Sequence, residues 1–315
     1  LGGVVYGAGL WLASHSETAL GLYTNLGGVV GIGIGLSGMI VVMGAVGQVA
    51  PPERRSTAFG VVTVAFSIGM FIMAPLLQYL INVYGWSGAL QASGGLVLII
   101  SLLALGLPGN SSKTEKSTER ETESELTLIK TINGAMNHSG YLLLNVGFFV
   151  CGFHVAFIGT HLPSFLQSEG ISISTASWAL AMIGLFNMFG SMIFGRMGDS
   201  LSKKNLLSLL YTLRAVVIAG FLAIPLNEIT AIAFGAAIGF LWLATVPLTS
   251  GIVAQVFGTR YLSTLWAIVF FSHQLGAFLG VWLGGRVYDA TGTYTPVWLA
   301  SIVLGLLAGI IHLPI

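Results

Sequence analysis

Long apolar runs constrain the fold of this chain more than any other feature. Ten stretches of mostly apolar residues are separated by short polar connections, and nearly all of them reach about 20 residues. A helix needs about 20 such residues to cross the hydrocarbon core of a bilayer, which is about 30 Å thick. The pattern therefore predicts ten membrane-spanning helices, at residues 1–15, 21–48, 57–81, 86–107, 139–166, 174–195, 205–225, 229–256, 261–285 and 294–312.

The composition agrees with a chain surrounded by lipid and excludes several other classes of protein. Apolar residues make up 55% of the chain and charged residues only 7%, whereas a soluble domain carries roughly 25% charged residues. Helices satisfy every backbone group inside lipid, and the alternating pattern of a membrane barrel is missing. A net charge of +1 without a basic stripe argues against a nucleic-acid partner. The single cysteine, Cys151, excludes an intramolecular disulfide and a multi-cysteine metal site.

A charged island divides the apolar runs into two groups. Residues 108–138 hold nine of the 23 charged side chains, with four runs before them and six after them. We therefore expect a partial N-terminal bundle at residues 1–107, a solvated linker without fixed structure at 108–138, and a C-terminal bundle at 139–315. The start of the chain at Leu1, inside an apolar run, suggests that an earlier part of the protein is missing from this sequence.

The distribution of Lys and Arg predicts which side of the membrane each connection faces. Cytoplasmic connections are enriched in these residues. Placing the island in the cytoplasm leaves only Arg286 on the opposite side, while Arg214 falls inside a run. The cytoplasmic side then holds ten basic residues, Arg54, Arg55, Lys113, Lys116, Arg120, Lys130, Arg196, Lys203, Lys204 and Arg260. Both ends of the chain are then expected in the cytoplasm.

Two connections of similar sequence suggest an internal repeat. Arg54-Arg55-Ser-Thr-Ala-Phe-Gly60 and Arg260-Tyr-Leu-Ser-Thr-Leu-Trp266 lie 206 residues apart, and each precedes the last two runs of its half. Parallel six-helix halves joined by a cytoplasmic linker are the plan of the major facilitator superfamily. The repeat by itself is a weak match, and its position in each half strengthens it.

A second motif resembles the signature loop between helices 8 and 9 of that superfamily. It reads Gly195-Arg196-Met197-Gly198-Asp199 and is followed by Lys203 and Lys204, although Ser200 stands where the family has a basic residue. Asp199 is expected to accept from free N–H groups at the N-terminus of a neighbouring helix. The resemblance implies that this loop locks one state of alternating access. The predicted lock residues are Gly195, Arg196, Asp199, Lys203, Lys204, Arg54, Arg55 and Arg260.

Two further stretches, residues 151–163 and 270–292, resemble a bacterial branch of the superfamily that is similar to the monocarboxylate transporters and the oxalate/formate exchangers. The resemblance implies an all-α integral membrane fold, a 6+6 bundle that lacks its first two helices here. It also implies a monomer in a bacterial inner membrane, with the linker and the C-terminus in the cytoplasm. A genuine ten-helix protein is the alternative.

Ionisable and strongly polar residues inside the runs are the candidates for substrate or proton contacts, because they are costly in lipid. His154 and His161 are seven residues apart and share a helical face, and a histidine suits proton coupling. Arg214 is a natural partner for a carboxylate. The alternative is that each histidine bonds to a carbonyl on the next helix and that Arg214 braces helix packing or snorkels along it. Asn187 is more often interhelical glue than a substrate contact. The charged pair that the monocarboxylate transporters carry on helix 8 is missing between residues 177 and 195.

Five further residues of interest lie on the runs at 229–256 and 261–285. Trp242, Thr245 and Thr249 recur at helical spacing and are expected to share one face, as a cavity wall or as bundle packing. His273 and Gln274 form a polar pair in an apolar setting, at a cavity or gate or in interhelical bonding.

Other apparent motifs are rejected. Gly33-Ile-Gly35-Leu-Ser-Gly38 matches a dinucleotide fingerprint, but it lies inside an apolar run with no preceding strand. Cys151, His154 and His161 lack a fourth ligand and nearby carboxylates, so we expect no metal and no cofactor. No buried Asp is present to orient a serine–histidine pair, so we expect no enzyme.

The sequence as a whole predicts a secondary transporter that works by alternating access. The expected substrate is a small organic anion, such as a monocarboxylate, moved with protons or against a counter-anion. Efflux of a neutral or hydrophobic compound is the first alternative, since buried charge is scarce. A non-transporting membrane sensor on the same fold is the second.

Overall fold

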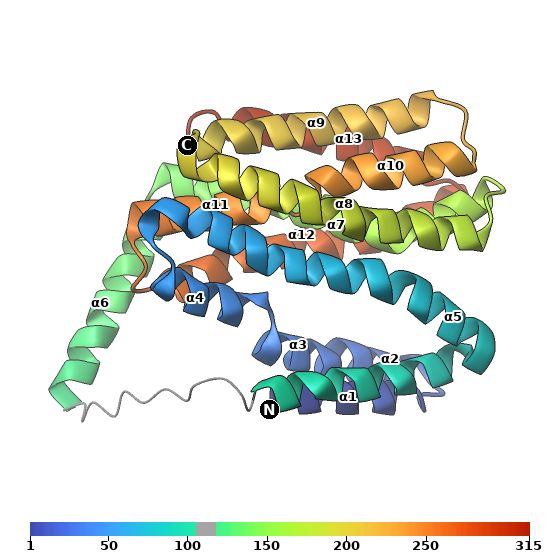
Figure 1. The fold of residues 1–315 in the computed structure, drawn as a ribbon, viewed down its shortest axis with the longest axis horizontal. Helices are drawn as coiled ribbons and strands as arrows, with labels where there is room; N and C mark the ends of the chain where they lie inside the picture. The colour runs from blue at the N-terminus through green and yellow to red at the C-terminus, as the bar shows by residue number, and fades with distance from the viewer. Residues whose placement is uncertain (105–117) are drawn as a thin grey trace. The chain divides into compact units, whose positions relative to one another are not determined.

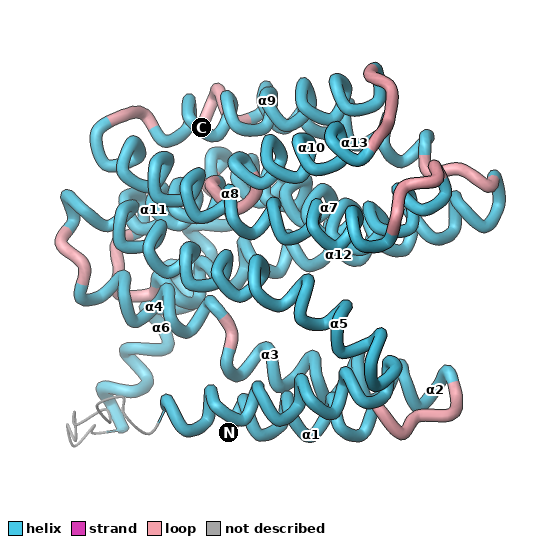
Figure 2. Tube along the Cα trace, turned by 45° about the vertical axis from the view of Figure 1, so that its right-hand side comes forward, coloured by secondary structure: helices cyan, strands magenta, loops and turns pink. Residues whose placement is uncertain are grey.

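The computed structural model describes residues 1–104 and 118–315, and every element in these ranges is a helix (Figure 2). The elements are α1 (Gly2–Ala13), α2 (Ala19–Leu22), the π-helix η1 (Tyr23–Val30), α3 (Gly31–Ser37), α4 (Met39–Val49), the 3₁₀ turn η2 (Pro52–Arg54), α5 (Arg55–Ala104), α6 (Thr118–Met136), α7 (Ser139–Ser168), α8 (Ile173–Ser200), α9 (Lys203–Ala223), α10 (Glu228–Leu241), α11 (Thr245–Phe257), α12 (Leu262–Thr291) and α13 (Thr295–Ile311).

The chain forms two compact units, and each unit is built from two stretches that are separate in the sequence. One unit contains Leu1–Val42 and Pro75–Glu125, and the other contains Met43–Ala74 and Leu126–Ile315. Helix α5 therefore contributes its first half to the second unit and its second half to the first. In the first unit, α1 packs closely against α5. A Cβ at Gly7 would lie 2.9 Å from the carbonyl oxygen of Gly94, so only glycine allows this approach.

Two of the expected spans meet at a kink inside α5, and another expected span is divided. Element α5 covers 50 residues and consists of two helices joined at Gly85, where the backbone is not helical and the φ of 69° favours glycine. These two helices correspond to the predicted spans at 57–81 and 86–107, the second as far as residue 104, where the described range ends. The predicted span at 21–48 is divided by Gly38, which is extended with a ψ of 177° and separates α3 from α4.

Helices α7 to α13 form the main body of the second unit (Figure 1). The most extensive pairings are α7 with α12, α8 with α10, and α9 with α13. The α7–α12 pair is tight because glycines line both sides. A Cβ at Gly276 would lie 1.9 Å from the carbonyl oxygen of Phe149, and one at Gly152 would lie 1.8 Å from that of His273. In lipid, such small residues let helix backbones approach and gain packing contacts.

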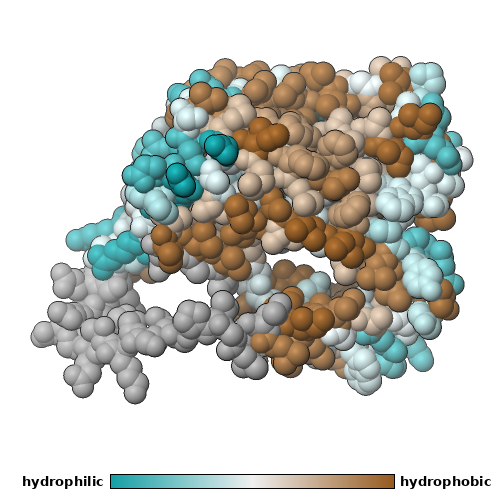
Figure 3. Space-filling view, in the orientation of Figure 1, coloured by the Kyte–Doolittle hydropathy of each residue, from teal (hydrophilic) through white to brown (hydrophobic). Residues whose placement is uncertain are grey.

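On the face drawn in Figure 3, the second unit carries an apolar band over the middle of its helices, with hydrophilic residues towards the helix ends. Seven helical segments in the described residues are long and apolar enough to cross a membrane, and Pro52–Leu102, with 51 residues, is long enough for two crossings. The helices α1 and α13 are shorter apolar segments. The predicted all-helical membrane fold with about ten crossings is confirmed.

The expectation that residues 108–138 lack structure is wrong for the part that the structure describes. Helix α6 occupies Thr118–Met136, while residues 105–117 lie outside the described ranges. Leu128, Ile132 and Ala135 recur at helical spacing, and Ala135 is only 1% exposed. This apolar stripe supports a helix. The prediction of a segment without structure rested on its high charge and did not consider the stripe.

Candidate functional site

The most unusual feature of the second unit is a break inside a membrane span. Residues Glu228–Phe257 form one apolar segment of 30 residues, yet residues 242–244 are not helical and separate α10 from α11. Pro247 explains the position of the break. Proline has no N–H to donate to the carbonyl of Leu243, four residues earlier, and its ring crowds that carbonyl. The break leaves backbone groups of the turn in need of partners from other helices.

Arg214, from α9, supplies donors to the carbonyl groups at the end of α10. Its Nε donates to the Leu241 carbonyl at 3.0 Å, and one Nη donates to the same oxygen at 2.7 Å and to the Trp242 carbonyl. The guanidinium is 1% exposed. A cation at a helix C-terminus also opposes the negative end of the helix dipole. Arg214 therefore stabilises the end of the broken helix.

Asn187, from α8, supplies the matching acceptor. Its Oδ1 accepts from the Leu243 N–H at 2.8 Å and from the Ser191 hydroxyl at 3.1 Å. Its Nδ2 donates to the Ser67 hydroxyl on α5 at 2.8 Å. Helix α8 can come this close to α10 because Gly190 has no side chain. A Cβ at this position would lie 1.8 Å from the carbonyl oxygen of Phe240.

Further polar side chains gather around Arg214. The Cys151 thiol on α7 lies 3.3 Å from the Thr245 hydroxyl and 3.5 Å from an Arg214 Nη. The Tyr211 ring lies 5.2 Å from the guanidinium carbon. Within the described residues, the hydroxyls of Tyr211 and Thr249 are buried without a hydrogen-bond partner. Sequence reasoning missed Tyr211, although its position three residues before Arg214 places it on the same helical face.

The expectation that Trp242, Thr245 and Thr249 share one helical face is wrong for Trp242. Trp242 belongs to the break rather than to α11, and its backbone carbonyl accepts from Arg214. Thr245 and Thr249 do lie one turn apart on α11, and both are fully buried. Pro247 carried the signal for the break, because it lies inside the predicted span.

The two histidines of α7 bond to backbone carbonyls on other helices. His154 Nε2 lies 2.8 Å from the Ser301 carbonyl on α13, and His161 Nε2 lies 2.9 Å from the Val281 carbonyl on α12. Nε2 donates in each pair, because a carbonyl oxygen can only accept. The His154 ring is buried, and its Nδ1 has no partner among the described residues.

His273 and Gln274 bond to each other on α12. His273 Nδ1 lies 3.2 Å from Gln274 Oε1, so the neutral ring carries its proton on Nδ1. The His273 ring is 7% exposed and stacks on Phe270, with ring centroids 5.1 Å apart. Its Nε2 has no hydrogen-bond partner within the described part of the chain, although the Cys151 thiol is near enough to interact with the ring electrostatically.

The signature-like loop makes the contact that its position predicts. Asp199, at the end of α8, accepts from the Ser56 N–H at 3.0 Å and from the Thr57 N–H at 3.2 Å, and the Thr57 hydroxyl also donates to it. These N–H groups belong to the first turn of α5, where helix geometry leaves them free. The carboxylate therefore caps α5 and complements the positive end of its dipole.

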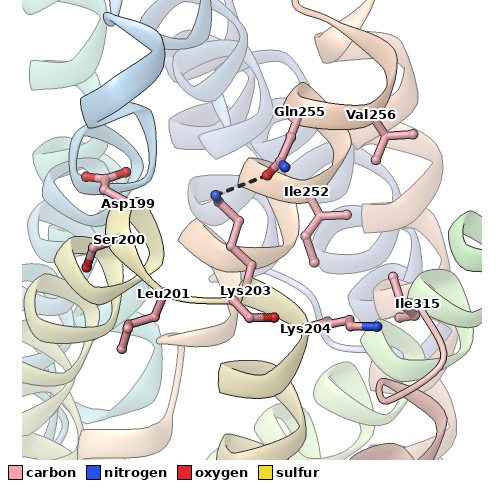
Figure 4. A pocket seen from close by; sticks show the side chains of 10 residues that line it. Asp199, Ser200, Leu201, Lys203, Lys204, Ile252, Gln255, Val256 and Ile315 are labelled. Carbon is pink, nitrogen blue, oxygen red and sulfur yellow. Dashed lines mark hydrogen bonds between the residues drawn. The ribbon is translucent and has the colours of Figure 1, made fainter.

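Of the other predicted lock residues, Lys203 and Lys204 lie beside this contact. Lys203 donates to Gln255 at 3.2 Å beside a cavity of about 400 Å³ that Asp199 and Lys204 also line (Figure 4). Lys204 donates to the Leu313 carbonyl at 3.0 Å. Gly195 lets α8 approach Ser56. Arg55 donates to the Ala50 carbonyl at 3.5 Å, and Arg260 lies over the Tyr261 ring. Arg54 and Arg196 are exposed.

Comparisons with known proteins agree on one family. A family model described as Major Facilitator Superfamily matches residues 1–281. Monocarboxylate transporter 12 of Rattus norvegicus is 28% identical, over 97% of this chain and 70% of its own length. Monocarboxylate transporter 13 of Rattus norvegicus is also 28% identical, over 95% and 68%. The uncharacterized MFS-type transporter YcxA of Bacillus subtilis is 24% identical, over 82% and 64%.

A solved structure shares the fold. A crystal structure of the E. coli fucose:proton symporter FucP superposes with a TM-score of 0.66 over 99% of this chain and 80% of that chain, at 14% identity.

Proposed function

The chain belongs to the major facilitator superfamily, and from this premise we propose that it moves a small organic anion, such as a monocarboxylate, by symport or antiport. It is a multi-pass membrane protein and a secondary transporter rather than an enzyme. The names of two similar proteins, monocarboxylate transporters 12 and 13, support the substrate class, since the similarity covers nearly the whole chain. The resemblance of residues 151–163 and 270–292 to a bacterial branch supports the same class.

The Asp199 cap on α5 is the observation that carries the alternating-access mechanism. It joins the end of α8 to the start of α5, which lie on either side of the charged island in the sequence. Charge-assisted bonds of this kind contribute about 1.5–3 kcal/mol, enough to shift a two-state equilibrium strongly and still be reversible. Its release and reformation would open and close this end of the transport path.

We assign the anion-binding and coupling role to His273 and Gln274 rather than to Arg214. The donors on Arg214 Nε and one Nη already bond to backbone carbonyls, so releasing them for a substrate would expose the end of α10. On His273, Nδ1 faces Gln274 and Nε2 carries a lone pair. Protonation of Nε2 creates both a positive charge and a new donor, so a carboxylate and a proton would bind together.

The sidedness that we propose follows from the basic residues. The loop between α8 and α9 and the charged island face the cytoplasm, as the ten-to-one distribution of Lys and Arg predicts. We place the protein in a bacterial inner membrane on the resemblance of its sequence and on the similarity to YcxA of Bacillus subtilis.

The bonding of Arg214 to carbonyls favours a second candidate function. With this guanidinium committed to the broken helix, the described interior of α7 to α13 offers few free charges to an anion. Efflux of a neutral or hydrophobic compound suits such an interior better. The two functions differ in whether uptake of carboxylates is measurable and depends on His273.

Uptake of labelled carboxylates into proteoliposomes tests the proposal. The protein is assayed against mono- and dicarboxylates with and without an inward proton gradient, beside His273→Ala and the control His15→Ala, whose imidazole is exposed and bonds to the Trp11 carbonyl. We expect uptake of at least one monocarboxylate, a loss of about tenfold or more in His273→Ala, and no change in His15→Ala. No uptake of any carboxylate would contradict the anion assignment and leave neutral efflux.

A further inference from the structure

A continuous chain of hydrogen bonds connects the broken helix to α5 through Asn187. The Leu243 N–H donates to Asn187 Oδ1, and Asn187 Nδ2 donates to Ser67 Oγ, both at 2.8 Å. The Ser67 hydroxyl donates in turn to the Thr63 carbonyl at 2.8 Å. Three helical elements, α11 with its preceding turn, α8 and α5, are thereby linked by one side-chain amide.

The chemistry of the groups fixes the direction of this chain. A backbone N–H can only donate, so the Asn187 atom that faces Leu243 is the amide oxygen, and the nitrogen faces Ser67. Ser67 must then accept from Asn187 with its lone pair and donate its proton to Thr63. Because Asn187 and Ser67 are both 0% exposed, water cannot replace a lost partner without entering the helix interface.

The position of Asn187 lies midway along the contact between α5 and α8. At one end of this contact, Asp199 caps α5 at Ser56. At the other end, the Ser177 hydroxyl donates to the Ala74 carbonyl at 3.3 Å. Close backbone approach is possible in between, since a Cβ at Gly184 would lie 2.5 Å from the Phe71 nitrogen. Any displacement of α5 along or away from α8 therefore acts on the Asn187–Ser67 bond.

The other end of the Asn187 amide accepts from a backbone donor that the break releases. In a continuous helix, the Leu243 N–H would donate to the Gly239 carbonyl, but in this structure the Trp242 N–H takes that carbonyl at 2.9 Å. The conformation of the turn thus depends on where Asn187 holds its oxygen.

We propose that Asn187 is a positioning residue that transmits the movement of α5 against α8 to the broken turn at residues 242–244. The inference rests on the proposed alternating access, in which α5 and α8 move relative to each other. Asn187 contacts no substrate in this role. The turn lies beside the cluster of Arg214, Cys151 and Thr245. When the contact between α5 and α8 opens, Asn187 moves the turn relative to this cluster.

The test measures hydrogen exchange by mass spectrometry in the peptide that covers residues 241–246, with the protein in lipid nanodiscs. Ser67→Ala removes the acceptor of Asn187 without touching the turn. Thr63→Val is the matched control, because the Thr63 hydroxyl makes the same kind of bond to the carbonyl four residues earlier on α5 but does not reach Asn187. No ligand is needed, so the result is independent of the carboxylate assay.

We expect exchange in this peptide to be about two- to tenfold faster in Ser67→Ala, the range that corresponds to the loss of one buried hydrogen bond. Thr63→Val should match the unmodified protein there, and Asn187→Ala should exchange fastest. Equal exchange in Ser67→Ala and the unmodified protein would overturn the proposal. Equal acceleration in Ser67→Ala and Thr63→Val would also overturn it, because that result indicates general loosening of α5. If Asn187→Ala does not fold, the comparison of Ser67→Ala with Thr63→Val still tests the proposal.

Discussion

Individual residues in this chain take their roles from backbone groups rather than from other charges. Arg214 is the clearest case, since the sequence alone leaves two roles open, the partner of a carboxylate and a brace of helix packing. Its Nε and one Nη instead bond to the carbonyls of Leu241 and Trp242. The sequence indicated that this residue is special but not what it contacts, because the contacting carbonyls are exposed only by a break in another helix.

Removing Arg214 is expected to destabilise the protein. Arg214→Met keeps a long, unbranched side chain but removes the guanidinium. It leaves two buried carbonyls without donors, at a cost of about 1–3 kcal/mol each. Thermal unfolding followed by intrinsic fluorescence in detergent should show a melting temperature several degrees lower. Arg196→Met, at an exposed position on α8, serves as the control and should melt like the unmodified protein. Identical melting of the two variants would contradict the role that we give to Arg214.

Whole elements are where sequence and structure agree best and also where they differ most visibly. The apolar runs predicted the long helices because length and hydropathy alone determine which segments can cross lipid. The break at residues 242–244 was not predicted, since it depends on Pro247 together with Arg214 and Asn187 on two other helices. The helix at Thr118–Met136 was missed because its charge hid its apolar stripe.

Close packing of α8 against α10 should depend on Gly190. A methyl group there would lie 1.8 Å from the Phe240 carbonyl oxygen, so one backbone must move. We expect Gly190→Ala to reduce the yield of monodisperse protein in size-exclusion chromatography severalfold. Gly220→Ala on α9 is the control, because nothing lies within 4 Å of its added Cβ. Normal behaviour of Gly190→Ala would show that the helices are less tightly packed than described.

In the molecule as a whole, the proposed alternating access depends on movement at the contact between α5 and α8. The sequence predicted the family plan from the charged island, the repeated loops and the signature-like motif, and the family is confirmed. It also predicted that Asp199 accepts from a helix N-terminus, a local rule that needs no tertiary information. The sequence did not predict which helix, because the partner lies more than 140 residues away.

A reversible cross-link across this contact tests whether transport requires the contact to open. A Cβ at position 198 would lie 3.4 Å from Ser56 Cβ, close to the roughly 3.5–4.5 Å that a disulfide requires. The variant combines Ser56→Cys and Gly198→Cys with Cys151→Ser, and uptake is measured with the acid that the carboxylate panel identifies. We predict that oxidation abolishes uptake, that dithiothreitol restores it, and that either single-cysteine variant is insensitive to oxidation. Full uptake by the cross-linked protein would contradict alternating access through the opening of this contact.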